Sequence, residues 1–111
     1  MIKVEIQRDR SRHVKQIVLT GHAGSGPYGS DIVCAAVSAL SIQAVNSLIA
    51  LVNINPEVEI DEVEGGYLSI RLPEVSDEQT KHDMNLLIDS LVLSLQQLRE
   101  ENQPYISIKE C

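Results

Sequence analysis

A histidine and a cysteine stand twelve residues apart, and together they could perform nucleophilic catalysis. His22 follows a predicted strand, and Cys34 falls in the first turn of a predicted helix. The stretch between them contains turn-forming residues: Gly24, Gly26, Pro27 and Gly29. The chain can therefore double back and bring the two side chains together. A helix N-terminus and an imidazolium both favour a thiolate. His22 could take the thiol proton and later return a proton to a leaving amine.

The residues around this pair leave alternatives open. Cys34 could instead be a small apolar residue that faces the core. Asp31, in the same helical turn, could orient His22, although capping the helix is the commoner role of an acid there. Ser38 lies one turn beyond Cys34 on the same face. Its hydroxyl could bond a substrate or the sulfur, or bond back to the Cys34 carbonyl, which is its commoner fate.

The other histidines and the second cysteine predict no further site. His13 and His82 stand in polar surroundings and are expected at the surface, and Cys111 is the last residue given. No spacing of Cys and His resembles a closed zinc site, so we expect neither a metal nor a cofactor. Two cysteines also make no disulfide framework.

The segment from Gly24 to Gly29 matches the G-x-G-x-x-G signature of dinucleotide-binding proteins. Three observations weaken the match. The preceding strand is expected in a hairpin and not in a βαβ unit, and Pro27 removes a backbone donor. An acidic residue is expected about twenty positions further on, yet none occurs between Asp31 and Glu57. A nucleotide-binding domain therefore remains a minor alternative.

Hydrophobic periodicity predicts an α+β fold with the order ββαββαβ. Strands are predicted at 2–8, 14–20, 57–64, 67–72 and 105–109. One helix is predicted from about 30 to 52, and a capping box at 76–79 opens a second. An apolar stripe is expected to pack the second helix on the core: Met84, Leu87, Ile88, Leu91, Leu95 and Leu98. Val58 and Ile60 are expected to face inward. The whole range 1–111 is expected to form one domain, a small sheet packed with two helices.

The first predicted helix is unusually apolar. No charged residue occurs from Ile32 to Pro56, but polar residues are spread through the segment and no basic cluster flanks it. We therefore expect a core helix, buried nearly all round, and no membrane span. Its apolar residues cover most of its circumference: Ile42, Leu48, Ile49, Leu51 and Val52. One small sheet cannot cover them all, which predicts a homodimer with this helix at or beneath the interface.

Composition and charge narrow the possible partners. The net charge is −7, and Trp and Phe are absent. Residues 1–30 carry five basic and two acidic groups, whereas 31–111 carry four basic and fourteen acidic groups. This balance opposes direct binding to nucleic acid and suits a basic partner. The first residues contain no apolar run of the kind found in secretory signals, so we expect a reducing cytoplasm.

Two blocks of sequence carry a family resemblance. The chain reads Gly21-His22-Ala23, then Gly26 and Gly29, then Asp31-Ile-Val-Cys34-Ala-Ala-Val-Ser38. These blocks, at this spacing, resemble the ribosomal-processing cysteine proteases of the Prp family, and the resemblance extends over the whole chain.

The resemblance implies an activity, a substrate and an assembly. Family members are cysteine endopeptidases that remove a short N-terminal extension from the large-subunit ribosomal protein L-twenty-seven. The resemblance implies that Cys34 is the nucleophile that forms a thioester acyl-enzyme and that His22 is the general base. It also implies a homodimer and a mobile loop with four glycines: Gly21, Gly24, Gly26 and Gly29. A non-catalytic ribosome-associated binding module, with a merely structural Cys34, is the principal alternative.

Overall fold

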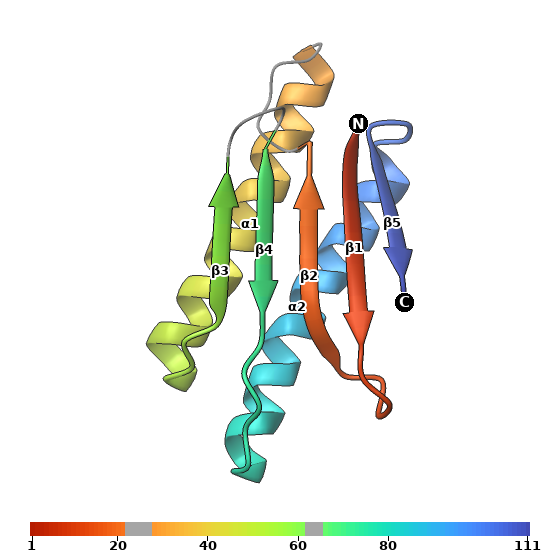
Figure 1. The fold of residues 1–111 in the computed structure, drawn as a ribbon. Coiled ribbons are helices and arrows are strands. Elements are labelled where there is room, and N and C mark those ends of the chain that lie inside the picture. The colour runs from red at the N-terminus through yellow and green to blue at the C-terminus, as the bar shows by residue number, and fades with distance from the viewer. Residues whose placement is uncertain (22–27, 62–65) are drawn as a thin grey trace.

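Five strands form one sheet, and two helices pack on one of its faces (Figure 1). The computed structural model describes residues 1–21, 28–61 and 66–111, and for residues 28–31 it describes the backbone alone. The elements follow the chain as β1 (Ile2–Arg8), β2 (Val14–Thr20), α1 (Tyr28–Val52), β3 (Glu57–Asp61), β4 (Tyr67–Arg71), α2 (Glu78–Glu101) and β5 (Ile106–Glu110). The predicted α+β class and the order ββαββαβ are confirmed.

The strands lie across the sheet in the order β3-β4-β2-β1-β5. All neighbours are antiparallel except β1 and β5, which run parallel. At the end of β2, Thr20 pairs with Lys3 on one side and with Tyr67 on the other. The chain therefore leaves β2 beside the start of β1 and the start of β4. This end of the sheet, at the top of Figure 1, is where α1 begins.

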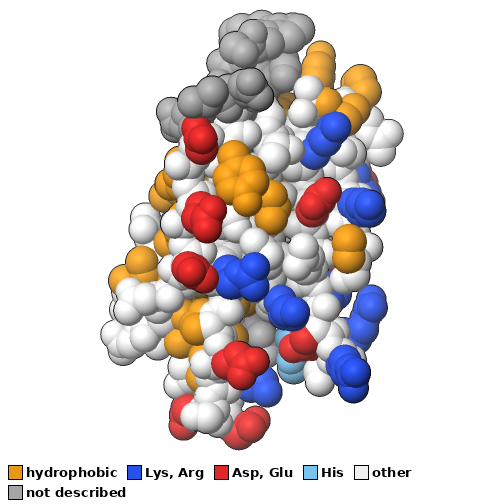
Figure 2. All heavy atoms as spheres, in the orientation of Figure 1, with side chains coloured by type: hydrophobic (Ala, Val, Ile, Leu, Met, Phe, Trp, Pro, Cys, Tyr) orange, Lys and Arg blue, Asp and Glu red, His pale blue; other side chains and the backbone are white. Residues whose placement is uncertain are grey.

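The sheet has one buried face and one open face. In β1, Ile2, Val4 and Ile6 are buried against the helices, whereas Lys3 and Glu5 are exposed on the other side. This alternation is typical of an antiparallel sheet with one solvated face. Figure 2 views the open face, where acidic side chains gather on the side of β3 and basic ones on the side of β1 and β5.

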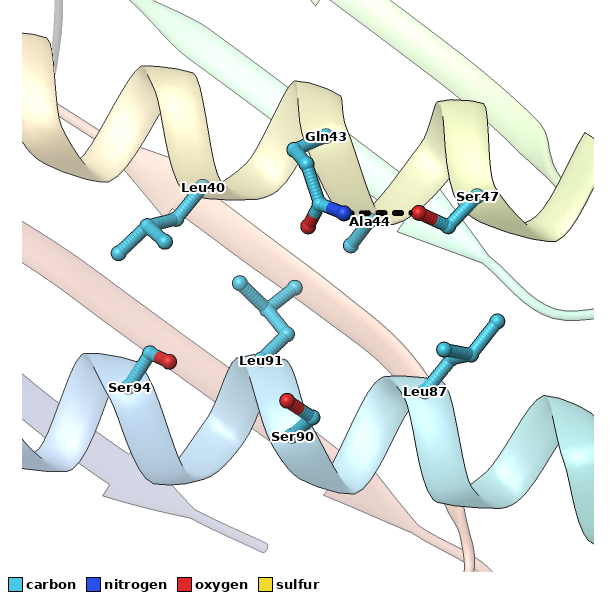
Figure 3. A pocket seen from close by; sticks show the side chains of 8 residues that line it. All are labelled: Leu40, Gln43, Ala44, Ser47, Leu87, Ser90, Leu91 and Ser94. Atoms are coloured by element: carbon cyan, nitrogen blue, oxygen red, sulfur yellow. Dashed lines mark hydrogen bonds between the residues drawn. The ribbon is translucent and has the colours of Figure 1, made fainter.

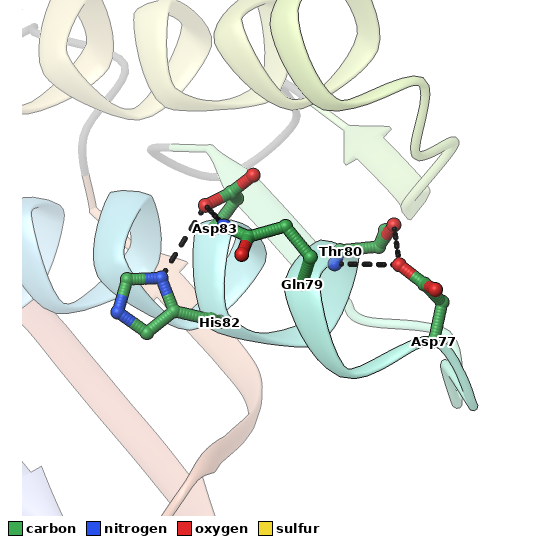
Figure 4. A network of polar contacts seen from close by, with 5 residues as sticks. All are labelled: Asp77, Gln79, Thr80, His82 and Asp83. Carbon is green, nitrogen blue, oxygen red and sulfur yellow. Dashed lines mark hydrogen bonds and ion pairs between the residues drawn. The ribbon is translucent and has the colours of Figure 1, made fainter.

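Helix α2 is amphipathic and begins one residue later than the predicted capping box would place it. Its N-cap is Asp77, not Ser76. The Asp77 carboxylate accepts hydrogen bonds from the Thr80 hydroxyl (2.7 Å) and the Thr80 backbone N–H (3.0 Å; Figure 4). These two bonds, the hydroxyl foremost, hold the pKa of Asp77 below its usual range. Asp77 is the N-cap because its carboxylate accepts hydrogen bonds from both donors at once.

The predicted stripe of α2 packs on the core as expected. Met84, Ile88, Leu91 and Leu95 are buried, and Leu87 and Leu98 are partly buried against the same cluster. Along the chain after α2, β5 adds to the sheet beside β1, so the helix crosses over the sheet before the last strand pairs.

Strand β3 departs from its prediction in burial. Ile60 pairs with Leu68, which is buried, and therefore lies on the same face of the sheet. However, Ile60 is 56% exposed and Val58 is only partly buried. The reason is that β3 is an edge strand, so a side chain can point to the helical face and still lack cover. The described part of the strand reaches Asp61, and the rest of its predicted range, 62–64, lies outside the described residues.

Helix α1 is not buried all round within a single chain. One side packs in the core through six residues: Val33, Cys34, Val37, Ser41, Ala44 and Leu48. The other side exposes apolar residues, among them Ile42, Ile49 and Leu51. By length and composition Ile32–Val52 could cross a membrane, and 39% of its most apolar window is buried. A core helix of a water-exposed domain passes the same test, and the packing of this helix on the sheet favours that interpretation.

Candidate functional site

Gly21 closes the β2 ladder in a conformation that suits only glycine. Its N–H donates to the carbonyl of Gly66 (3.1 Å), which extends the pairing of β2 with β4 by one residue. Its φ is +80°, in the left-handed region. A Cβ at this position would collide with the backbone carbonyl oxygen of Met1. Gly21 therefore belongs to the end of the sheet, not to the interior of the loop.

Cys34 is the seventh residue of α1 and is placed deeper in the helix than predicted. Because the helix begins at Tyr28, Cys34 lies in the second turn and not in the first. The effect of the helix dipole fades beyond the first turn, so the dipole contributes less to a thiolate than the sequence suggested. The side chain is buried, with 4% of its surface exposed, and belongs to the hydrophobic core cluster.

The Cys34 thiol has one described polar partner, the carbonyl oxygen of Gly21. The sulfur donates to this oxygen at 3.5 Å. The two interpretations of Cys34 are therefore not exclusive: the residue faces the core, and its sulfur also reaches the residue that precedes His22 in the chain. His22 itself, with Gly24 and Gly26, lies outside the described residues.

The remaining predicted residues lie on α1. Gly29 and Asp31 are the second and fourth residues of the helix, and the Asp31 side chain is outside the described part. Ser38 is partly buried four residues beyond Cys34. Its predicted bond to the Cys34 carbonyl is absent from the described residues. Ser41, by contrast, donates to the Val37 carbonyl at 2.8 Å.

Of the other two histidines, one is exposed as predicted and one is partly buried, and the second cysteine is exposed. His82 is exposed beside Asp83 (3.3 Å; Figure 4), and His13 is partly buried in the turn between β1 and β2. Cys34 and Cys111 are both free, so they form no disulfide. Within the described ranges no three His, Cys, Asp or Glu side chains converge as a metal site.

The described strands also disfavour the dinucleotide-binding interpretation. Such a site needs a strand that runs into a crossover helix and then into a parallel neighbour. Strand β2 instead pairs antiparallel with both β1 and β4. The glycine spacing of residues 24–29 therefore lacks the structural context that would give it that role.

Two hollows within the described residues lie away from Cys34. A cavity of about 80 Å³ separates α1 from α2, where Leu40 and Leu91 face each other and Gln43 bonds Ser47 (2.8 Å; Figure 3). A groove of about 690 Å³ lies between the β1–β2 turn and the start of α2, at the other end of the sheet. Neither is lined by Cys34 or Gly21.

The sequence could not have identified the acceptor of the thiol. A glycine at the end of a strand predicts a turn, but no pattern says that its carbonyl meets a helix thirteen residues later. The contact with Met1 depends on the register in which β1 pairs with β2. The hairpin prediction gave the pairing of these strands but not its register.

Comparison with known proteins agrees with this geometry. A family model described as cysteine protease Prp matches residues 1–107. The ribosomal processing cysteine protease Prp of Bacillus subtilis is 34% identical over 101 residues, which cover 91% of this chain and 89% of that protein. A crystal structure from Streptococcus mutans superposes with a TM-score of 0.90 at 36% identity and covers 99% of this chain and 93% of the other.

A third similarity is to a structure with a peptide bound. The Prp protease of Staphylococcus aureus, an essential ribosomal processing protease solved in complex with a substrate peptide, superposes with a TM-score of 0.86 at 32% identity, over the full length of both chains. The match of the family model and the coverage of these relatives leave one assignment: this chain belongs to the Prp family of ribosomal processing cysteine proteases.

Proposed function

We propose that this protein removes the N-terminal extension of the ribosomal protein L-twenty-seven, with Cys34 as nucleophile and His22 as general base. The observation that carries the assignment of Cys34 is its contact with the backbone of the Gly-His motif. The thiol bonds the oxygen of Gly21, and a peptide bond joins Gly21 to His22. This contact supports a Cys–His pair because it joins the Cys34 sulfur to the residue that directly precedes His22 in the sequence.

The proposed reaction needs one proton acceptor and one covalent intermediate. His22 takes the proton from the Cys34 sulfur, and the sulfur attacks the carbonyl carbon of the scissile bond. The tetrahedral intermediate collapses as the C–N bond breaks, and His22 gives its proton to the leaving amine. Water then attacks the thioester and restores the free thiol, so the reaction needs no cofactor.

The start of α1 offers donors for the developing oxyanion. The first four N–H groups of a helix have no partner within the helix, and in α1 these belong to residues 28–31. The N–H of Cys34 lies within the helix, where it can pair with the carbonyl four residues earlier. We therefore assign the oxyanion donors to the first turn of α1 and not to the nucleophile's own N–H.

Burial of the sulfur sets a requirement on the reaction. At 4% exposure, Cys34 cannot meet a peptide carbonyl in the described conformation. Attack requires a rearrangement that uncovers the sulfur. The mobility predicted for the glycine-rich loop would supply it, although residues 22–27 lie outside the described part.

The charge of the molecule suits a basic substrate. Strand β3 is at the edge of the sheet, and it exposes Glu57 and Glu59. An extended peptide can pair with such an edge through its backbone, while acidic side chains attract its lysines and arginines. A ribosomal protein tail has both properties, and the net charge of −7 favours its approach.

A cleavage assay tests this function. The purified protein is incubated with a synthetic peptide that spans the extension of L-twenty-seven, and the products are identified by mass spectrometry. One cut is expected, and it should disappear with Cys34→Ala. An intact peptide that nevertheless binds would favour the non-catalytic binding module.

We also propose that the protein is a cytoplasmic homodimer. An exposed stripe of α1, apolar except for Asn46, supports the dimer, since its residues follow a helical spacing of three and four: Ile32, Ala35, Ala39, Ile42, Asn46 and Ile49. The stripe carries no charge, and a second copy of the chain could cover it. The free thiol of Cys34 suits a reducing compartment.

A further inference from the structure

Gly21 connects three segments of the chain that are distant in sequence. Its N–H donates to the carbonyl of Gly66, just before β4, and a Cβ on it would meet the carbonyl of Met1, just before β1. Its own carbonyl oxygen accepts the thiol of Cys34 from α1 (3.5 Å). The position of the thiol's partner is therefore fixed by the sheet and not by the loop that follows.

The Met1 carbonyl is itself fixed. It belongs to the same peptide group as the N–H of Ile2, which donates to the Tyr105 carbonyl at 2.9 Å. The next residue, Lys3, pairs with Thr20. An L-residue at position 21 would have to displace this paired backbone and also adopt φ +80°. Relief by either route would move the oxygen that faces the sulfur.

We propose that Gly21 is a positioning residue for cleavage, whose carbonyl orients the Cys34 thiol at rest and releases the sulfur when the proton leaves. The proposal rests on the assignment of Cys34 as nucleophile. A carbonyl oxygen accepts a hydrogen bond from S–H but has nothing to accept from a thiolate, whose charge it repels. When the S–H bond breaks and His22 takes the proton, the contact with Gly21 is lost. The freed sulfur then uses its electron pair to attack the peptide carbonyl.

The stereochemistry at Gly21 allows a sharp test. A D-residue adopts a positive φ without strain, and its methyl group takes the place of the other α-hydrogen, on the side of Cα opposite the L-type Cβ. Residues 1–33 can be made as a synthetic peptide and joined to residues 34–111 at Cys34 by native chemical ligation. Three full chains are compared in a Cys111→Ser background: Gly21, L-alanine and D-alanine at position 21.

A distant left-handed residue provides the matched control. Asn53 has φ +59° at the far end of α1, about 28 Å along the helix from Cys34. Asn53→Ala introduces comparable backbone strain without touching the site. It should lower stability and leave kcat unchanged.

The first readout is kinetic. Ångström-scale misplacement of a reacting group costs up to about a hundredfold in rate, so L-alanine should reduce kcat by a factor of that order with little change in KM. D-alanine should retain most of the activity. Equal kcat for the L-alanine and glycine chains would overturn the proposal, as would equal loss with both alanines while the chains remain folded.

The second readout is spectroscopic, and its decisive measurement is made on the chain with glycine at position 21. With Cys111 replaced, the infrared S–H stretching band reports Cys34 alone. It should lie at the lower frequency of a hydrogen-bonded thiol in the glycine and D-alanine chains. A band at the frequency of a free thiol in the glycine chain would refute the contact, even if the L-alanine chain failed to fold. Absence of cleavage by the glycine chain, with the S–H band of a bonded thiol, would instead count against the proposed function.

Discussion

As the proposed nucleophile, Cys34 would combine two roles that usually exclude each other, since a core residue is shielded and a nucleophile must be reached. The structure shows the shielded state, in which the sulfur is buried and bonded to a backbone oxygen. A thiol held in this way is protected from adventitious oxidation, because reactivity follows thiolate character and exposure. The proposed enzyme would therefore expose its nucleophile only during its reaction.

Replacing the nucleophile should separate chemistry from folding. Cys34→Ala and Cys34→Ser are both expected to abolish cleavage, because a methyl group is inert and a hydroxyl is far less acidic than a thiol. Serine can still donate to the Gly21 carbonyl, and alanine removes a single heavy atom, so destabilisation should stay near about 1 kcal/mol. Product formation by mass spectrometry and thermal unfolding measure the two effects, with Cys111→Ser as the active control. Cleavage by either Cys34 variant at the normal rate would contradict the role of Cys34.

The proposed base can be tested through the reactivity of the thiol. In a Cys111→Ser background, His22→Ala should abolish cleavage and slow alkylation of Cys34 by iodoacetamide at neutral pH. The midpoint of alkylation should move to higher pH, because the thiolate loses its cationic partner. His82→Ala removes an exposed histidine and serves as the matched control. An unchanged midpoint after His22→Ala would mean that the pair does not form.

Residue types and spacing predict which residues react, but they do not predict the geometry of those residues at rest. The pairing of His22 with Cys34 was predicted from residue types and spacing, and it stays a prediction because His22 lies outside the described residues. The prediction that Cys34 lies in the first turn of the helix was wrong by one turn. Gly29 suggested a loop, whereas the backbone there is already helical. The Gly21 acceptor depends on strand pairing between distant segments, which local patterns do not encode.

At the scale of elements, the strongest signals were periodic ones. The alternation in β1 and the stripe in α2 predicted both the elements and their buried faces, because side-chain period alone decides which face is apolar. The predicted burial of Ile60 was wrong. The side chain lies on the predicted face, but its strand is at the edge of the sheet. Edge or centre is a property of the assembled sheet, so no strand carries it in its own sequence.

The N-cap of α2 makes the stability of the fold depend on pH in the acidic range. The pKa of Asp77 is lowered in the folded state, chiefly by the Thr80 hydroxyl, so the carboxylate stabilises the fold fully above its unfolded value of 3.8. That contribution is lost progressively as pH falls from 3.8 through the lower folded value. Asp77→Asn should keep a cap but lose this dependence. Melting curves between pH 2 and 6 measure it, and Asp89→Asn, on an exposed later turn of α2, is the control.

A contrary result for Asp77 is easily recognised. If the Asp77→Asn chain and the parent lose Tm in parallel as pH falls, the acid sensitivity comes from other carboxylates and the cap contributes none of it.

At the scale of the molecule, charge and apolar surface are separated. The open face of the sheet carries acidic and basic side chains (Figure 2), whereas an uncharged stripe runs along α1 on the opposite, helical side. A substrate steered by charge and a second copy held by apolar contact would therefore use different sides. The proposed dimer and the proposed peptide site need not compete.

The dimer can be tested with two separate variants, each of which introduces one charge on one helix. Sedimentation equilibrium should give twice the 12.3 kDa mass of one chain at micromolar concentration. Ile49→Glu, which alters a side chain 45% exposed on α1, should shift the mass toward that of one chain. Leu86→Glu, 61% exposed on α2, is the matched control and should leave the mass unchanged. A single-chain mass for the parent would exclude the dimer, and a dimer that survives charges along the whole stripe would place its interface elsewhere.

The parallel pairing of β1 with β5 has a mechanical consequence. A force that pulls on Ile2 and Glu110 draws the two strands in opposite directions along their length, so their evenly spaced hydrogen bonds must rupture together. A force on Lys3 and Thr20, which are paired across β1 and β2, would instead peel that hairpin open one bond at a time. Single-molecule pulling should therefore record a higher rupture force for the first pair of handles than for the second.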